Sequence, residues 1–201
     1  MTARLCAVMM ALSLLSGCTS MKPSDFKKTD PRLAIEEYFA GRTRAWGIFE
    51  DRFGKLRRQF TVDIDGTWDG SELVLDERFQ YSDGEQDRRV WRIRKTGDHT
   101  YEGRAADVIG TATGEAYGNA LNWRYDMDLK VGDGTMRVHF NDWMFLQPAG
   151  VLINRARVSK FGIGIGEVTL FFTKAKQAAG AVGQSVSEEP TVHEARQAAN
   201  R

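Results

Sequence analysis

Residues 121–131 read LNWRYDMDLKV, and this stretch decides the fold. Apolar side chains occupy every second position, and Asn, Arg, Asp or Lys stands at each position between them. Because successive side chains of a β-strand point to opposite faces of a sheet, this alternation predicts a strand with one dry face and one wet face. Residues 60–68, FTVDIDGTW, show the same two-residue period. We therefore expect an all-β domain.

Turn signals divide the chain around these two stretches. Asp69-Gly70 lies between two alternating runs and is the strongest short signal of a β-hairpin. Similar turn residues recur near positions 54, 83–84, 97–98, 118–119, 132–134 and 148–150. Their spacing fits strands of about ten residues joined by tight turns, without a helix long enough for a parallel crossover. The pattern predicts an antiparallel meander that ends near Phe172.

A meander of this length is expected to close into a barrel. Closure removes the unpaired edge strands, and a barrel of eight strands has room for a small ligand, with more room for ten. We therefore expect a closed antiparallel barrel of eight to ten strands. The alternative is a sandwich of two sheets, which the long consecutive hairpins disfavour.

The barrel domain is expected to cover residues 30–173. It begins with a short helix of about two turns, since Asp30-Pro31 is typical of a helix start and Gly41 of a helix end. Residues 174–201 contain no aromatic side chain and are rich in Ala, Gln, Gly, Ser and Glu. That composition predicts a disordered C-terminal tail, because it buries too little apolar surface to offset the entropy of ordering.

The first eighteen residues resemble the export signal of a bacterial lipoprotein. Arg4 precedes an apolar run over residues 5–15, and the sequence Leu15-Ser16-Gly17-Cys18 completes the segment. The run suits a signal peptide and falls short of the roughly 20 residues that a membrane-spanning helix needs. The last four residues resemble a lipobox, in which the cysteine sulfur receives diacylglycerol and the chain is cut before the cysteine. The alternative is an ordinary secretory peptide with a cysteine at this place by chance.

This resemblance implies a cellular location and a lipid anchor. Residues 1–17 are the expected signal peptide, Cys18 is the expected lipidation site, and residues 18–29 are the expected polar tether. Thr19, standing where Asp would retain a lipoprotein in the inner membrane, implies the periplasmic face of the Gram-negative outer membrane. Two or three acyl chains anchor a protein stably, at about 0.8 kcal/mol for each buried methylene. The membrane is therefore an expected partner.

The charge balance argues against nucleic acid as a partner. The 201 residues include 28 basic and 27 acidic side chains, a formal net charge of +1. Phosphate binding needs a clustered basic surplus. The hydrophobic fraction of 42% is ordinary for a globular domain. Cys6 leaves with the signal peptide and Cys18 carries lipid, so we expect no disulfide in the mature chain.

Charged residues in the apolar phase of the strands are the candidate ligand-binding groups. Glu77 lies in phase with apolar neighbours, and so does Asp142. Arg89 or Arg155 could pair with one of these carboxylates, which must be paired, hydrated or protonated inside a barrel. The alternative is a strand end or bulge that returns each side chain to water. The expected ligand-binding set, completed by nearby aromatic side chains, is Glu77, Trp91, Trp123, Tyr125, Phe140, Asp142 and Arg155.

Other motifs carry no expected chemistry. The glycines of residues 162–166, GIGIG, precede a strand pattern instead of a helix, so they predict a strand start and not a phosphate site. His99, His139 and His193 have no metal-ligand spacing, and no GxSxG or HExxH motif is present. We expect no catalytic residue, no metal and no cofactor. The five tryptophans are candidates for a lumen that binds sugar or lipid, or for simple packing.

Two stretches resemble a known family. Residues 38–49, YFAGRTRAWGIF, and residues 141–170, with NDWMFL, LINR, SKFG and GEVTL, are similar to the bacterial lipoprotein family called domain of unknown function 3833. The resemblance implies a lipid-related role, because genes of this family are associated with neighbours that modify membrane fatty acids. The barrel also resembles the lipocalins and other calycins, and Gly66-Thr67-Trp68 is similar to the lipocalin Gly-x-Trp. It closes a strand here, where the lipocalin motif opens one.

These observations lead to one leading expectation and two alternatives. The first is an all-β, calycin or lipocalin-like barrel with a short N-terminal helix. The barrel binds a lipid or other hydrophobic ligand, and the protein has a role in membrane lipid modification or envelope stress. The second is a non-enzymatic interaction module with a solid barrel. The third is an enzyme on envelope lipid or glycan, with Glu77 or Asp142 as acid or base. The sequence favours a binding protein over an enzyme.

Overall fold

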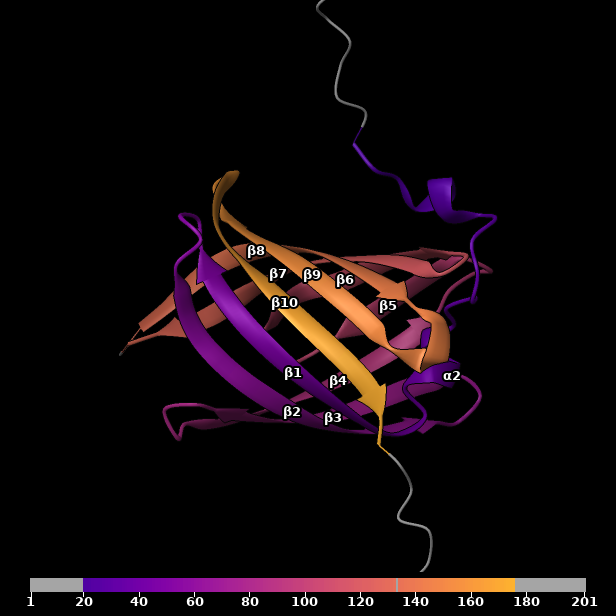
Figure 1. The fold of residues 1–201 in the computed structure, drawn as a ribbon, viewed down its shortest axis with the longest axis horizontal. Helices are drawn as coiled ribbons and strands as arrows, with labels where there is room; N and C mark the ends of the chain where they lie inside the picture. The colour runs from indigo at the N-terminus through magenta and orange to yellow at the C-terminus, as the bar shows by residue number, and fades with distance from the viewer. Residues whose placement is uncertain (1–19, 133, 176–201) are drawn as a thin grey trace, which may run out of the picture.

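A computed structural model describes residues 20–132 and 134–175 and shows a closed barrel of antiparallel strands (Figure 1). The strands are β1 (Gly41–Asp51), β2 (Leu56–Trp68), β3 (Glu72–Tyr81), β4 (Gln86–Lys95), β5 (Thr100–Arg104), β6 (Val108–Tyr117), β7 (Ala120–Val131), β8 (Gly134–Leu146), β9 (Leu152–Lys160) and β10 (Ile163–Lys174). Each strand pairs with its neighbours in the chain, and β10 pairs with β1 to close the barrel. The predicted eight- to ten-stranded meander is confirmed, with ten strands.

The predicted turns join these strands. Gly54, Gly70, Gly84 and Gly118 each lie at a turn with a positive φ, which glycine adopts without steric cost. The alternation also holds over residues 121–127: Leu121, Trp123, Tyr125 and Met127 are buried inside the barrel, Arg124 and Asp126 are exposed, and Asn122 is buried although it has the outward phase. The two-residue period therefore sets which side chains fill the interior.

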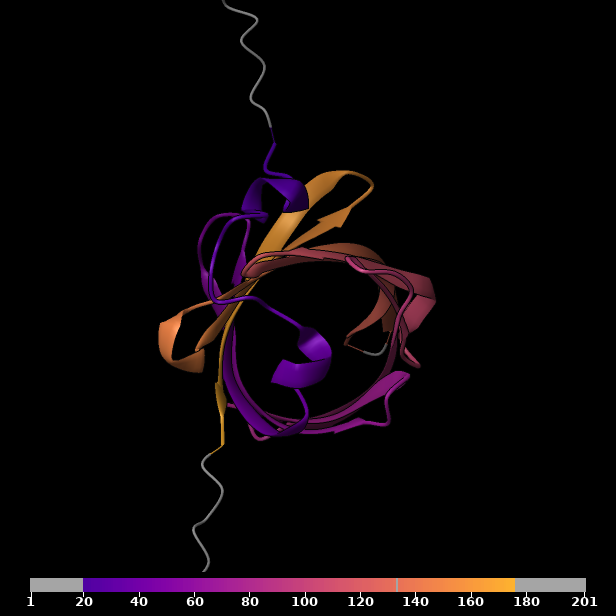
Figure 2. The same ribbon diagram turned by 90° about the vertical axis from the view of Figure 1, so that its right-hand side faces the viewer.

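The short helix α2 (Ile35–Tyr38) closes one end of the barrel (Figure 2). Leu33, Ile35 and Phe39 are buried there, and the Phe39 ring packs edge-on against Phe172. Gly66 of β2 makes this packing possible, because a Cβ atom at that position would collide with the Phe39 carbonyl oxygen. The expected two-turn helix from Asp30-Pro31 is wrong in its length. It begins only at Ile35, since the residues before it are extended.

The interior differs between the two ends of the barrel. At the α2 end the inward side chains are fully buried, among them Leu73, Leu121 and Leu152. At the opposite end, formed by the β1–β2, β3–β4, β7–β8 and β9–β10 hairpins, inward side chains keep accessible surface. These half-buried side chains are Phe49, Phe60, Phe79, Leu129 and Met136. The hairpin end is therefore the more accessible one, and we call it the open end.

The segment that precedes the barrel packs against its outer wall. The 3-10 turn η1 (Pro23–Phe26) lies over β6 and β7, and Phe26 contacts the rings of Trp143 and Phe145. Part of the expected polar tether, residues 20–29, therefore packs against the barrel. Thr29 Oγ1 also donates to Asn119 Oδ1 at 2.7 Å. A second 3-10 turn, η2 (Pro148–Gly150), joins β8 to β9.

The signal peptide, Cys18 and the C-terminal tail beyond residue 175 lie outside the described residues. Among the residues that are described, no helix is long and apolar enough to cross a membrane.

Candidate functional site

Four polar side chains meet in the middle of the barrel interior. Glu77 on β3 lies opposite Arg89 on β4 in the strand ladder. Across the barrel, Tyr125 on β7 and Asp142 on β8 come from adjacent strands, and the Tyr125 hydroxyl donates to Asp142 Oδ2 at 3.4 Å. Each residue has the phase of its apolar neighbours, so the strand period alone turns all four inward. We call Glu77, Arg89, Tyr125 and Asp142 the luminal cluster.

Arg89 has a carboxylate partner on the side of the open end. Its guanidinium lies 2.9 Å from Asp107 Oδ2, in the loop between β5 and β6. Its Nη2 also approaches the Met127 sulfur at 3.6 Å. Burial lowers the pKa of Arg89, but its interactions with Tyr125, Glu77 and Asp107 raise it by more. The cluster therefore holds a permanent positive charge.

Glu77 is enclosed without being buried completely. Its side chain keeps some accessible surface, yet desolvation raises its pKa to about 7, against the opposing effect of Arg89. Both properties fit a carboxyl group that lines a lumen surrounded by protein. Near neutral pH this group exists in both protonation states, so it can donate or accept a hydrogen bond.

Asp142 is the most deeply placed carboxyl group of the cluster. It is only 6% exposed, and desolvation raises its pKa to about 7, although its hydrogen bond with Tyr125 and the charge of Arg89 lower it. Its Oδ1 atom is buried and has no hydrogen-bond partner among the described residues. A buried polar atom without a partner costs about 1–3 kcal/mol, so a ligand that supplied one would gain that energy. Desolvation and Asp142 together raise the pKa of Tyr125 well above its usual value.

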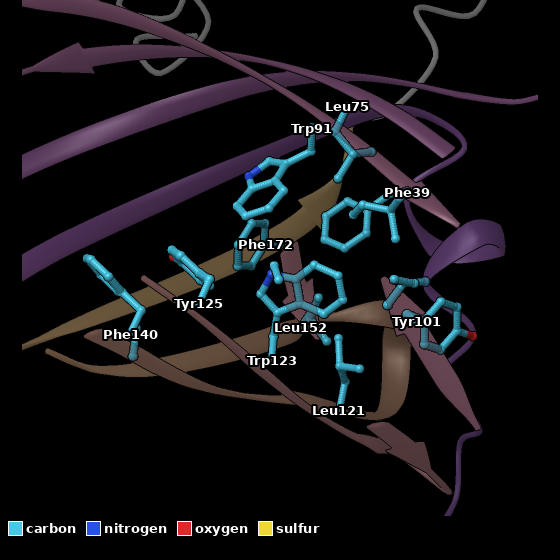
Figure 3. Packing of buried hydrophobic residues seen from close by; sticks show 14 of the residues in the cluster. Phe39, Leu75, Trp91, Tyr101, Leu121, Trp123, Tyr125, Phe140, Leu152 and Phe172 are labelled. Atoms are coloured by element: carbon cyan, nitrogen blue, oxygen red, sulfur yellow. The ribbon is translucent and has the colours of Figure 1, made fainter. Parts of the chain in front are cut away.

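An aromatic wall lines the interior from the closed end to the cluster (Figure 3). The rings of Trp123 and Trp91 meet edge to face at 5.8 Å, and Trp91 meets Tyr125 in the same way at 5.3 Å. Tyr125 then stacks in parallel on Phe140 at 5.0 Å. Trp123 itself lies against Gly103 and Gly114, where a Cβ atom would collide with its indole. This wall offers apolar surface next to the polar groups, as sites for amphiphilic ligands do.

The structure brings together six of the residues expected to bind a ligand. Glu77, Trp91, Trp123, Tyr125, Phe140 and Asp142 all face the interior. Their ligand-binding role stays a prediction. No bulge or strand end returns Glu77 or Asp142 to water, since both lie within continuous ladders.

Arg155 does not join them, and the expectation that it points inward is wrong. It lies on the outer wall, where its guanidinium is 3.0 Å from Glu167. The inward residues of β9 are its neighbours in sequence, Asn154 and Ala156. The phase error arises after the turn at η2, which restarts the alternation at Leu152. The arginine that faces the carboxylates is Arg89, the other candidate in the apolar phase of its strand.

Some tryptophans lie inside the barrel and others lie on its outer surface. Trp91 and Trp123 are interior residues, whereas Trp46 is 46% exposed on the outside of β1. Trp143 packs outside against Phe26. Asp107 was missed entirely, because it lies in a short loop with no alternation that would mark its direction. Its only sequence signal is its place between two strand patterns.

The arrangement can bind a polar group and exchange protons with it. It offers one guanidinium, one phenol and two carboxyl groups that titrate near neutral pH. Among residues 20–132 and 134–175, no three side chains of His, Cys, Asp or Glu are grouped as a metal site.

Comparison with known proteins supports the fold. A family model described as a protein of unknown function (DUF3833) matches residues 12–174. No curated protein matches the chain. Among solved structures, the S-type phycobiliprotein lyase CPES from Guillardia theta is similar, with a TM-score of 0.55 at 10% identity over 78% of this chain and 99% of that chain. At this identity the likeness shows the fold alone, and it confirms the predicted lipocalin-like barrel.

Proposed function

This chain belongs to the DUF3833 family of proteins of unknown function, and we propose that it is a lipid-anchored envelope protein whose barrel binds a hydrophobic ligand carrying a polar group. The observation that carries the proposal is the luminal cluster beside the aromatic wall. Asp142 Oδ1 lacks a hydrogen-bond partner within the described part of the chain, and Glu77 of the same cluster keeps accessible surface. A ligand with an apolar body would cover the wall, and its polar group would meet the cluster.

The anchor and the location rest on the N-terminal sequence. The apolar run, the lipobox-like residues 15–18 and Thr19 support lipidation at Cys18 and the periplasmic face of the outer membrane. A barrel held at the membrane surface would have lipids within reach. A lipid is therefore the ligand class that we propose, in a role connected with membrane lipid modification or envelope stress.

Native mass spectrometry of the full chain, purified from its membrane in mild detergent, tests the proposal. We expect a discrete additional mass that disappears after extraction with organic solvent. Arg89→Gln should reduce the bound fraction at least about tenfold, since removing a charged hydrogen-bond partner costs about 1.5–3 kcal/mol.

Arg155→Gln is the matched control, because Arg155 also pairs with a carboxylate but lies on the outer wall. It should retain the additional mass in full. Asp142→Asn is nearly isosteric and provides a second luminal variant if Arg89→Gln is unstable. A wild-type chain that carries only its own mass and that of the anchor, under all growth conditions, would contradict ligand binding.

A second candidate is a non-enzymatic interaction module that uses the outside of the barrel. A shallow groove on the outer wall of β1, β2, β3 and β10 favours it, with Trp46, Ile48 and Phe171 in its lining. Trp46 and Phe171 face each other across the β1–β10 ladder, and each is nearly half exposed. A photo-crosslinker at position 46 should give discrete protein adducts in cells if this groove binds a partner. The same crosslinker at Arg155 is the control.

A further inference from the structure

The open end of the barrel has an unusual apolar rim. Phe161, at the tip of the β9–β10 hairpin, is 94% exposed, and Phe53, at the tip of the β1–β2 hairpin, is 79% exposed. Ile163 and Leu56 stand beside them with 62% and 45% of their surface exposed. Apolar side chains this exposed add little to the stability of the fold, so their position needs another explanation.

These two hairpin tips form one surface. Strands β1 and β10 pair along the barrel wall as far as Asp51 and Gly166. Beyond that pair, the Arg52 amide donates to the Ile165 carbonyl oxygen at 3.0 Å. The two phenylalanines therefore project from neighbouring, mutually bonded hairpins. We call Phe53, Leu56, Phe161 and Ile163 the apolar lip.

Backbone geometry argues against Phe161 as a simple turn residue. Its φ is 51°, in the left-handed region that glycine adopts easily and a bulky residue adopts at a cost. The next residue, Gly162, also has a positive φ. The turn by itself therefore does not favour phenylalanine at its most exposed position.

Cations flank the apolar lip. The Arg52 guanidinium lies 4.7 Å from the centre of the Phe53 ring, and the Lys160 ammonium lies 5.5 Å from the centre of the Phe161 ring. Arg52, Lys55 and Lys160 form no salt bridge with any described residue, whereas most arginines on the barrel wall do. Alternating aromatic and basic side chains at a tip suit the boundary of an anionic bilayer, where rings enter the headgroup region and cations meet phosphates.

The next hairpin around the mouth, beside β2, has the reverse character. The β3–β4 hairpin carries Asp83, Glu85 and Asp87, and Arg58 reaches across to the first two, at 3.0 and 2.7 Å. No large apolar side chain is exposed at this turn. A flat anionic surface would therefore attract one side of the mouth and repel the other.

The start of the described chain lies on the same side as the apolar lip. Figures 1 and 2 show η1 and the β9–β10 hairpin at the top of the barrel in both views, near its two ends. We infer that the apolar lip is a second membrane contact, which inserts Phe53 and Phe161 into an anionic phospholipid surface and places that side of the open mouth at it. The orientation relative to the anchor rests on the proposed lipidation, but the lip itself does not.

Spin labelling of the full chain on vesicles tests this inference. With Cys6→Ser as the background, a nitroxide is attached to Phe53→Cys, Phe161→Cys or, as the control on the acidic side, Glu85→Cys. The vesicles contain phosphatidylethanolamine and phosphatidylglycerol. We expect the labels at 53 and 161 to lie about 5–10 Å below the headgroup surface, exposed to oxygen and shielded from a water-soluble nickel chelate. The label at 85 should stay accessible to the chelate.

Three results would overturn the inference. The first is equal access of the chelate to all three labels. The second is unchanged shielding on vesicles of phosphatidylcholine alone, which would remove the role of the cations. The third is shielding at 53 and 161 that arises without vesicles at high protein concentration, which would indicate contact between two copies of the chain.

The Cys6→Ser parent, labelled in parallel, takes up a nitroxide at Cys18 only if that thiol is not lipidated, so the anchor is tested separately. Loss of the luminal ligand would leave the label depths unchanged.

Discussion

The pKa of an enclosed glutamate shifts in opposite directions in the two halves of the barrel interior. At the closed end, the carboxylate of Glu36 on α2 accepts hydrogen bonds from Lys95 Nζ and Tyr101 Oη, both at 2.8 Å. Desolvation acts to raise the pKa of Glu36, but these partners lower it by more. In the open half, desolvation dominates and raises the pKa of Glu77 to about 7.

This difference distinguishes a carboxylate that stabilises the fold from carboxyl groups that are available to a ligand. The chain supplies every partner that Glu36 needs, and the helix that carries it seals the end. Asp142 Oδ1 in the cluster is buried without a hydrogen-bond partner among the described residues, and the other such atom is the hydroxyl oxygen of Thr43, near the closed end. Unsatisfied polar groups are rare inside proteins, because each one costs stability. The closed end thus satisfies its buried carboxylate, whereas the luminal cluster keeps a carboxyl oxygen that a ligand can satisfy.

Truncation of the same side chain in each half should show the largest contrast. Leu152 is fully buried at the closed end, and Leu129 is half-buried near the open end. We expect Leu152→Ala to lower the free energy of unfolding by about 3 kcal/mol, since it leaves a cavity that closely packed neighbours cannot fill. Leu129→Ala should cost about 1 kcal/mol, because little packing is lost where solvent already enters. Urea unfolding measures both, and equal losses would contradict a difference between the halves.

The sequence predicts this contrast only in part. The two-residue period of residues 121–131 places Trp123 and Tyr125 inside correctly, because strand phase is a local property. The order of the strands follows from the turns at Gly54, Gly70 and Gly84. The assembly of the luminal cluster does not follow, since it depends on which strands meet across the interior. Asp107 in a loop carries no such signal.

A rise in pH should lower the stability of the barrel through the carboxyl groups of Glu77 and Asp142. The folded-state pKa values of Glu77 and Asp142, each about 7, lie above their values in the unfolded chain, which are close to 4.5 and 3.8. The folded state therefore binds more protons between those limits, so stability is greatest below them and falls as the pH rises through 7. From pH 5 to pH 8 we expect a loss of about 2.5 kcal/mol for each of the two groups, nearly all of it between pH 5 and pH 7.

Urea unfolding across this range measures the slope. The double variant with Glu77→Gln and Asp142→Asn should flatten it, because neither replacement titrates. The surface carboxylates with lowered pKa, such as Asp65 and Asp76, stay charged throughout and do not contribute. A wild-type stability that is constant or rises between pH 5 and pH 8 would contradict the enclosure of the luminal carboxyl groups.

Glu36→Gln tests the closed end with a smaller expected effect. Glutamine keeps the size of the side chain and can still accept the bond from Tyr101, but it loses the charge that pairs with Lys95. We expect a loss of about 1 kcal/mol, typical of one hydrogen bond that is no longer charge-assisted. Since the pKa of Glu36 is lowered, its contribution is present at neutral pH and disappears only in acid. The difference between variant and wild type should therefore shrink as the pH falls below 4.5 and vanish once the folded-state carboxylate is protonated.

The smallest effect is expected for Arg155→Gln, which compares an arginine–carboxylate pair on the outer wall with the pair that Arg89 makes inside. Arg155 and Glu167 lie outside, with 54% and 30% of their side-chain surface exposed. Water solvates both charges whether or not they pair, so we expect a change below about 0.5 kcal/mol in urea unfolding, reduced further by salt. Arg89 and Asp107 make a pair of similar length, but Arg89 is enclosed and also faces Glu77. If Arg155→Gln destabilised the chain as much as Arg89→Gln, enclosure would not be what distinguishes the luminal arginine, and the case for a ligand site around it would lose its basis.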